Sequence, residues 1–207
     1  MADIRKTVRH ERHALAVDLG ALDDAAWSTP SLCSGWTVRE VLAHMTALER
    51  MSPLLFVRKL VASGCRPSRL QARDMVAEQG RSVGETLERF RDVTAGGPRL
   101  HAVPAKTALG ETLVHAEDIR RPLGIHHAYP PGALVAVADA YKDSNLVAGT
   151  RRRIAGLSLQ ATDIAWGTGG GPVVSGPMLS LLMAMAGRHA ALEDLRGEGV
   201  ETLRSRT

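Results

Sequence analysis

The residues best suited by type and spacing to do chemistry are Glu111 and His115, four positions apart in a segment whose pattern predicts a helix. Because an α-helix has about 3.6 residues per turn, the two side chains lie on one face, one above the other. A carboxylate and an imidazole placed in this way can bind one divalent metal ion. His44, in a second predicted helix, is the candidate third ligand. Two imidazoles and one carboxylate leave a coordination position open, as in catalytic zinc sites.

The spacing alone also allows a simpler interpretation. Glutamate and histidine occur four residues apart on many helices, so Glu111 and His115 could form a surface pair while His44 packs in the core. The position of His44 favours the metal site, because it lies beside the apolar stripe of its predicted helix and not opposite it. Zinc suits this ligand set best, and nickel, iron and manganese bind the same types of ligand.

The helix that carries His44 is expected to begin after Thr37, since Thr37-Val-Arg-Glu40 matches a capping box. Its apolar stripe consists of Val38, Val41, Leu42, Met45 and Leu48. Pro53 should interrupt this helix. Helical spacing and stop signals predict further helices over residues 3–20, 54–63, 69–80, 83–94, 107–121 and 133–147.

The pattern changes after residue 150. Residues 154–162 alternate apolar and polar side chains, which predicts a strand, and short strands are expected at 173–174 and 200–203. An apolar helix over 178–186 follows Pro177. The chain is therefore predicted to be mainly α, with a helical bundle over residues 1–150 and a small α+β domain over residues 151–207.

The composition limits the classes of partner. Of the 207 residues, 44% are hydrophobic and only 3% aromatic, so an aliphatic, helical core is expected, and the net charge is +4. The densest basic run, Arg151–Arg153, is short and has no aromatic residues beside it, so we expect no nucleic-acid partner. The two cysteines, Cys33 and Cys65, indicate neither a disulfide framework nor a thiolate metal site, and they fit a reducing compartment.

The same sequence predicts a cytoplasmic location. The N-terminus turns charged at once, without the apolar region of a signal peptide. The longest apolar stretch, near 178–186, is too short to span a bilayer, so no membrane association is expected. The sequence does not constrain the oligomeric state.

Three segments carry a resemblance to a known family: Trp27–His44, Gly110–Gly124, and the stretch from Gly176 to Arg188. The first contains Trp-Thr-Val-Arg-Glu-Val-Leu-Ala-His and the second Glu-x-x-x-His-x-x-Asp-Ile. Together they resemble the maleylpyruvate isomerase family of mycothiol-dependent enzymes, within the DinB-like metal-binding superfamily. The resemblance implies a DinB-like four-helix bundle followed by a small sterol-carrier-like C-terminal domain that helps to close the active site. It also implies zinc bound by His44, Glu111 and His115.

The resemblance further implies a metal-dependent and mycothiol-dependent isomerase or S-transferase. A metal-bound thiolate of mycothiol would attack a small electrophile, either maleylpyruvate-like or a xenobiotic, because a coordinating thiol is deprotonated. In an isomerase the thiolate adds to an activated double bond, allows rotation and leaves; in a transferase the adduct is the product. Two other functions stay open, namely a non-catalytic metal-binding sensor or scaffold and a hydrolase that uses zinc-bound water.

Two further residues are candidates for roles at this site. Arg188 could donate a fork of hydrogen bonds to a carboxylate of the substrate or cofactor, or could simply be solvated at a helix end. Asp118, one turn beyond His115, could orient the free nitrogen of that ring or could pair with Arg121.

Overall fold

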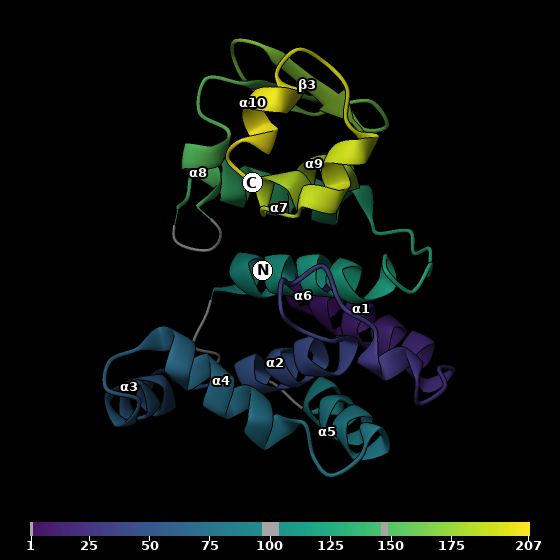
Figure 1. Ribbon diagram of the computed structural model, residues 1–207, viewed down its shortest axis with the longest axis vertical. Coiled ribbons are helices and arrows are strands. Elements are labelled where there is room, and N and C mark those ends of the chain that lie inside the picture. The colour runs from purple at the N-terminus through teal and green to yellow at the C-terminus, as the bar shows by residue number, and fades with distance from the viewer. Residues whose placement is uncertain (1, 97–103, 146–148) are drawn as a thin grey trace. The chain divides into compact units, whose positions relative to one another are not determined.

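The computed structural model describes residues 2–96, 104–145 and 149–207, which fall into two compact units. Unit 1 comprises residues 1–127 and unit 2 residues 128–207. The protein is mainly helical, as predicted, with one small sheet in its described part (Figure 1). Among the helices of these ranges, none has the length and hydrophobicity to cross a membrane.

Unit 1 consists of helices. They are α1 (Ala2–Gly20), the short 3₁₀ helix η1 (Ala26–Ser28), α2 (Val38–Arg50), α3 (Pro53–Ala62), α4 (Pro67–Glu78), α5 (Val83–Ala95) and α6 (Ala105–Arg120). The bounds agree with the sequence-based ranges to within about two residues.

Helices α1, α2, α5 and α6 share the core of unit 1. Helix α1 packs against α5 and α6, while α2 packs against α4, α5 and α6 (Figure 1). The largest fully buried apolar side chains of this core are Leu15, Leu19, Leu42, Phe90, Leu109, Leu113 and Ile119. The aliphatic core expected from the scarcity of aromatic residues is therefore observed in this unit.

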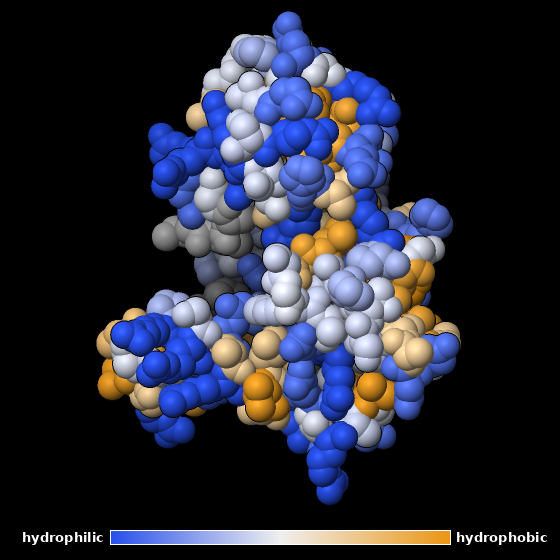
Figure 2. Space-filling view, in the orientation of Figure 1, coloured by the Kyte–Doolittle hydropathy of each residue, from blue (hydrophilic) through white to orange (hydrophobic). Residues whose placement is uncertain are grey.

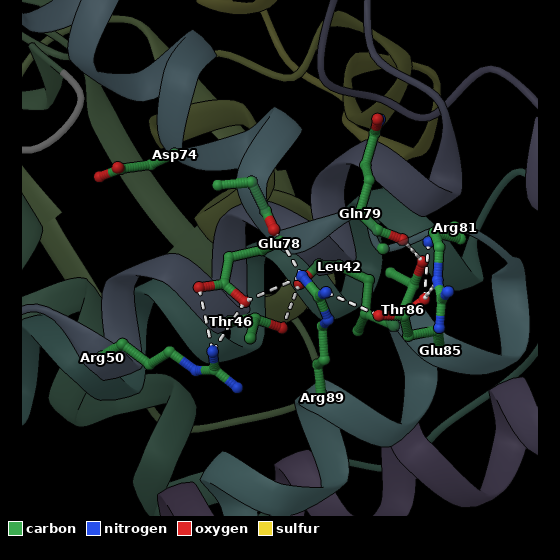
Figure 3. A network of polar contacts seen from close by, with 12 residues as sticks. Leu42, Thr46, Arg50, Asp74, Glu78, Gln79, Arg81, Glu85, Thr86 and Arg89 are labelled. Atoms are coloured by element: carbon green, nitrogen blue, oxygen red, sulfur yellow. Dashed lines mark hydrogen bonds and ion pairs between the residues drawn. The ribbon is translucent and has the colours of Figure 1, made fainter.

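A polar network joins α2, α4 and α5 on the side of the unit shown in Figure 3. Arg50 of α2 bonds Glu78 of α4 at 3.3 Å, and Arg89 of α5 lies 4.0 Å from the same carboxylate. Arg39, near the start of α2, donates to the hydroxyl of Thr86 at 3.0 Å. These contacts hold the three helices in register, so the position of α2 does not depend on apolar packing alone.

Helix α3 lies at the surface of unit 1, and none of its residues is buried. Leu54 is 80% exposed and Val61 65% exposed. The space-filling view shows apolar side chains among charged ones at the surface of α3 and α4 (Figure 2). This helix therefore contributes little to the core that supports α2 and α6.

Unit 2 contains a mixed sheet covered by helices. Its elements are α7 (Pro131–Lys142), α8 (Thr150–Arg153), β1 (Ser158–Ala161), β2 (Gly167–Gly169), β3 (Val173–Gly176), α9 (Met178–Met185), η2 (His189–Asp194) and α10 (Val200–Arg204). In the described residues the strand order is β2-β1-β3, with β1 antiparallel to β2 and parallel to β3. Helix α9 packs against β1, β3 and α7, and seven of its eight residues are buried.

The second unit differs from the sequence-based expectation in three places. The strand expected at 200–203 is wrong, because these residues form the helix α10. The two buried side chains there, Val200 and Leu203, are three positions apart, a spacing that suits a helical face as well as a short apolar strand. The strand expected at 154–162 is limited to β1. The glycine-rich residues 167–169, for which no strand was expected, form the edge strand β2.

The division between the units falls before α7, whereas the sequence places a domain boundary at residue 150. Helix α7 packs against α9, and this contact assigns it to unit 2. It ends at Lys142, and residues 146–147 of the helix predicted over 133–147 lie outside the described residues.

Candidate metal centre

Helix α6 places Glu111 and His115 on one face, as the four-residue spacing predicts. The Nε2 atom of His115 lies 3.1 Å from Oε2 of Glu111. His115 is 8% exposed, and the side chain of Glu111 is 23% exposed. The pair is therefore largely buried in unit 1, which excludes a fully solvated surface pair.

Helix α2 brings His44 to the same place. The capping box at its start is complete: the hydroxyl of Thr37 accepts from the backbone N–H of Glu40, and the Glu40 carboxylate accepts from the backbone N–H of Thr37. Seven residues later, the ring of His44 meets that of His115 edge to face, with centroids 5.1 Å apart. The ring of Trp36, just before the cap, lies 5.1 Å from His44 on another side.

These three side chains fit a metal ion by donor type and by separation. One ligand atom from each of His44, Glu111 and His115 lies within 4.8 Å of the other two. Tetrahedral zinc with nitrogen and oxygen ligands needs donor atoms roughly 3.4 Å apart. The 3.1 Å between Glu111 and His115 is close to this value, and the ligand atom of His44 lies within 4.8 Å of both. The structure thus brings together the three residues that the sequence singled out.

The electrostatic environment keeps the two histidines in different protonation states. Burial first, and then the nearby charge of His115, lower the pKa of His44 to about 4 against the attraction of Glu111. Burial also opposes protonation of His115, but hydrogen bonds to Asp118, Cys33 and Glu111 together raise its pKa well above the usual value. A neutral His44 is ready to serve as a ligand, since metal binding requires the unprotonated imidazole.

Asp118 occupies the far side of the His115 ring. Its Oδ2 lies 2.9 Å from Nδ1 of His115, and the carboxylate is fully buried. Arg121, the partner that the sequence offered as an alternative, lies 3.7 Å from the carboxylate of Glu117. Asp118 is thus placed where it can orient the histidine ring.

Cys33 is a neighbour of this site that the sequence pattern does not predict. Its Sγ lies 3.1 Å from Oδ2 of Asp118 and 3.7 Å from Nδ1 of His115. Cys33, His115 and Asp118 also lie close enough together to be grouped as possible metal ligands. The available signal was the position of Cys33 inside the Trp27–His44 segment, but two cysteines in unrelated contexts gave no reason to consider it.

Arg188 lies in unit 2, directly after α9. The backbone N–H of Gly187 bonds the Ala184 carbonyl and that of Arg188 bonds the Met183 carbonyl, which is the Schellman arrangement at a helix end. Gly187 has φ 88, which favours glycine there, and a Cβ at this position would meet the Arg153 guanidinium at 2.9 Å. The Arg188 guanidinium donates to the Ala186 carbonyl at 2.9 Å, so it helps to cap α9.

The N-terminal part of the sequence matches a known protein family. A family model described as the mycothiol maleylpyruvate isomerase N-terminal domain matches residues 8–120, which include all three candidate ligands. The chain belongs to this family. A search of curated proteins finds no match.

Two solved structures of a mycothiol-dependent maleylpyruvate isomerase, one of them a histidine-to-alanine mutant, are similar to this chain. Each is 17% identical to it with a TM-score of 0.59, and the alignments cover 95% of this chain and 92% of theirs. At this identity the likeness establishes the fold, and it extends beyond the residues that the family model matches.

Proposed function

We propose that this chain is a metal-dependent and mycothiol-dependent isomerase or S-transferase that acts on small electrophilic substrates, maleylpyruvate-like or xenobiotic. The observation that carries this proposal is the meeting of His44, Glu111 and His115 in a member of this family. Neither the family match nor the spacing would be enough alone. The similar solved enzyme is a mycothiol-dependent maleylpyruvate isomerase, which is the source of the substrate class.

The three side chains would hold one divalent metal, with zinc as the first candidate because two imidazoles and a carboxylate suit it. When bound, the metal supplies an open coordination position that lowers the pKa of a thiol, which gives a sulfur nucleophile near neutral pH. The chain's own residues prepare this position. Asp118 holds the ring of His115, and the low pKa of His44 keeps that ring unprotonated.

Three structural proposals accompany this function. Helices α1, α2, α5 and α6 would form the DinB-like four-helix bundle, since they share one core. Unit 2 would correspond to the sterol-carrier-like domain implied by the sequence. Arg188 would donate hydrogen bonds to a carboxylate of the substrate, as guanidinium groups commonly do.

The deciding experiment is a titration of mycothiol against zinc-loaded wild-type protein and His44→Ala. Mycothiol should bind the wild type, while loss of a ligand should lower the zinc affinity of His44→Ala by more than about 100-fold and abolish thiol binding. His13→Ala, which removes an exposed histidine of α1, is the matched control and should behave like the wild type. Absence of mycothiol binding to zinc-loaded wild type would refute the thiol-dependent function and favour a scaffold or a hydrolase.

Metal analysis of Glu111→Ala and His115→Ala tests the ligand set independently of the thiol. Both variants should lose most of the bound metal, because each removes one of three protein ligands. Full metal content in both would show that the ion is held elsewhere.

A further inference from the structure

We infer that Cys33 is a positioning residue for His115, acting through the buried carboxylate of Asp118. The inference rests on the proposed metal site and adds a residue to it. The Cys33 thiol donates to the same oxygen, Oδ2, that accepts from Nδ1 of His115. One carboxylate oxygen thus receives two hydrogen bonds, one from the loop before α2 and one from α6.

Burial makes this pair of hydrogen bonds important. Asp118 has no solvent exposure, so water does not replace a donor that is lost there. A buried carboxylate needs donors to offset the free-energy cost of removing its charge from water. With Oδ2 fixed by Cys33, the Nδ1–H of His115 has one defined direction, and Nε2 on the opposite side of the ring points to Glu111.

The loop from Thr29 to Thr37 is built in a way that keeps Cys33 in place. The backbone N–H of Trp36 bonds the carbonyl of Cys33 at 3.0 Å, and Gly35 within this turn has φ 78, a value that a type II turn requires. The hydroxyl of Ser31 donates to the Trp36 carbonyl at 2.8 Å and accepts from the backbone N–H of Cys33 at 3.1 Å.

The same loop also forms a backbone hydrogen bond to α6, and this bond is to Asp118, the residue that the Cys33 side chain contacts. The backbone N–H of Leu32 bonds the carbonyl of Asp118 at 3.0 Å. Backbone and side chain of Asp118 are therefore both tied to neighbouring residues of one short loop. Because this loop also ends in the cap of α2 and carries Trp36 against His44, it contacts both histidine ligands. Trp36 contacts His44, and Cys33 reaches His115 both through Asp118 and directly, with its Sγ 3.7 Å from Nδ1.

The test compares two variants of nearly equal size. Cys33→Val fills the same space without a donor, whereas Cys33→Ser retains a hydroxyl that can donate to Asp118. Cys65→Ala, which removes the exposed second cysteine, is the control. Zinc affinity is measured by competition with a chelator, and the thermal unfolding of each metal-free variant reports on the fold.

We expect Cys33→Val to bind zinc about 3- to 10-fold more weakly. This is less than the roughly 10- to 100-fold typical of the residue that orients a metal ligand, because Asp118 still accepts from Nδ1 of His115 in the variant. Cys33→Ser and Cys65→Ala should stay within about twofold of the wild type. In NMR spectra of the zinc-loaded protein, the Nδ1 proton of His115 should exchange with water faster in Cys33→Val than in Cys33→Ser. A role in packing alone would not separate these two variants in that way.

Two outcomes would overturn the inference while leaving the proposed function intact. Equal zinc affinity and equal proton exchange in Cys33→Val and the wild type would leave the metal site standing and remove Cys33 from it. A thiolate-to-metal charge-transfer band in cobalt-substituted wild type, absent in Cys33→Ser, would make Cys33 a ligand and not a positioning residue. If zinc does not bind the wild type at all, the proposed function fails, and this inference fails with it.

Discussion

At the scale of single residues, His115 connects the two carboxylates of the site, because one of its ring nitrogens contacts Asp118 and the other contacts Glu111. Nδ1 lies 2.9 Å from Asp118 and Nε2 lies 3.1 Å from Glu111. Because the pKa of His115 is raised, its ring must first give up one proton to bind a metal. A neutral histidine that donates from Nδ1 to a carboxylate then presents the lone pair of Nε2, which is the form that a metal binds. The ring nitrogen available for metal binding is thus selected by Asp118, on the side of the ring away from the proposed ion.

Replacement of Asp118 by asparagine should show this effect. Asp118→Asn keeps the size of the side chain but removes its charge, so we expect zinc to bind about 10- to 100-fold more weakly. The measurement is zinc affinity by chelator competition at neutral pH. Glu117→Gln is the matched control, since it removes a largely buried carboxylate from the neighbouring position of the same helix. An equal loss in both variants would mean that the effect is general electrostatics and not orientation of His115.

The sequence predicts some of these residues and not others, for a physical reason. Glu111 and His115 follow from helical geometry, because residues four apart share a face. Cys33 contacts His115 across 82 positions and Asp118 across 85. No sequence periodicity relates a loop residue to a helix so distant in the chain. This contact therefore depends on the tertiary packing of the loop on α6 and is not predicted by the sequence pattern.

At the scale of elements, the start of α2 is where local sequence has the greatest influence on the site. Its capping box fixes the first turn, and His44 follows two turns later on the buried side. Ser82-Val-Gly-Glu85 has the same capping-box spacing at the start of α5, but only half of the box forms there. There the hydroxyl accepts from the backbone N–H of Glu85, but the Glu85 carboxylate bonds the backbone N–H of Arg81.

These two caps provide a matched pair of substitutions. Thr37→Ala and Ser82→Ala should each lower the free energy of unfolding by about 1 kcal/mol, as loss of an N-cap usually does. Only Thr37→Ala should also weaken zinc binding, because α2 carries a ligand and α5 carries none of the three. Chemical denaturation and chelator competition measure the two effects. Equal zinc affinities in these variants would show that core packing, and not the cap, positions His44.

The elements that the sequence predicts poorly are short and lie in unit 2. Long periodic segments such as α1 and α6 have enough turns to make their apolar face evident. Val200 and Leu203 are only two buried positions, too few to distinguish one face of a helix from a short strand buried on both faces. Their helical form depends on packing inside the unit. The assignment of α7 to unit 2 likewise depends on its contact with α9, which no local pattern encodes.

At the scale of the whole molecule, the two units carry different parts of the proposed chemistry. All three candidate ligands, together with Asp118 and Cys33, belong to unit 1, whereas Arg188 belongs to unit 2. Within unit 2, burial and the charge of Arg188 both lower the pKa of Arg153. Two neighbouring guanidinium groups that repel each other favour the approach of an anion, so a substrate carboxylate is a reasonable partner for Arg188.

This division of roles can be tested with Arg188→Ala. Zinc content should equal that of the wild type, because no ligand is removed, while the KM for an electrophile that carries a carboxylate should rise about tenfold or more, as expected for loss of a hydrogen bond to a charged group. The KM for the corresponding neutral ester should change little. Arg204→Ala, which removes an arginine paired with Glu201 on α10, is the control within the same unit. A similar rise in KM for acid and ester would show that Arg188 acts by capping α9, through the bond to Ala186, and not by recognising the carboxylate.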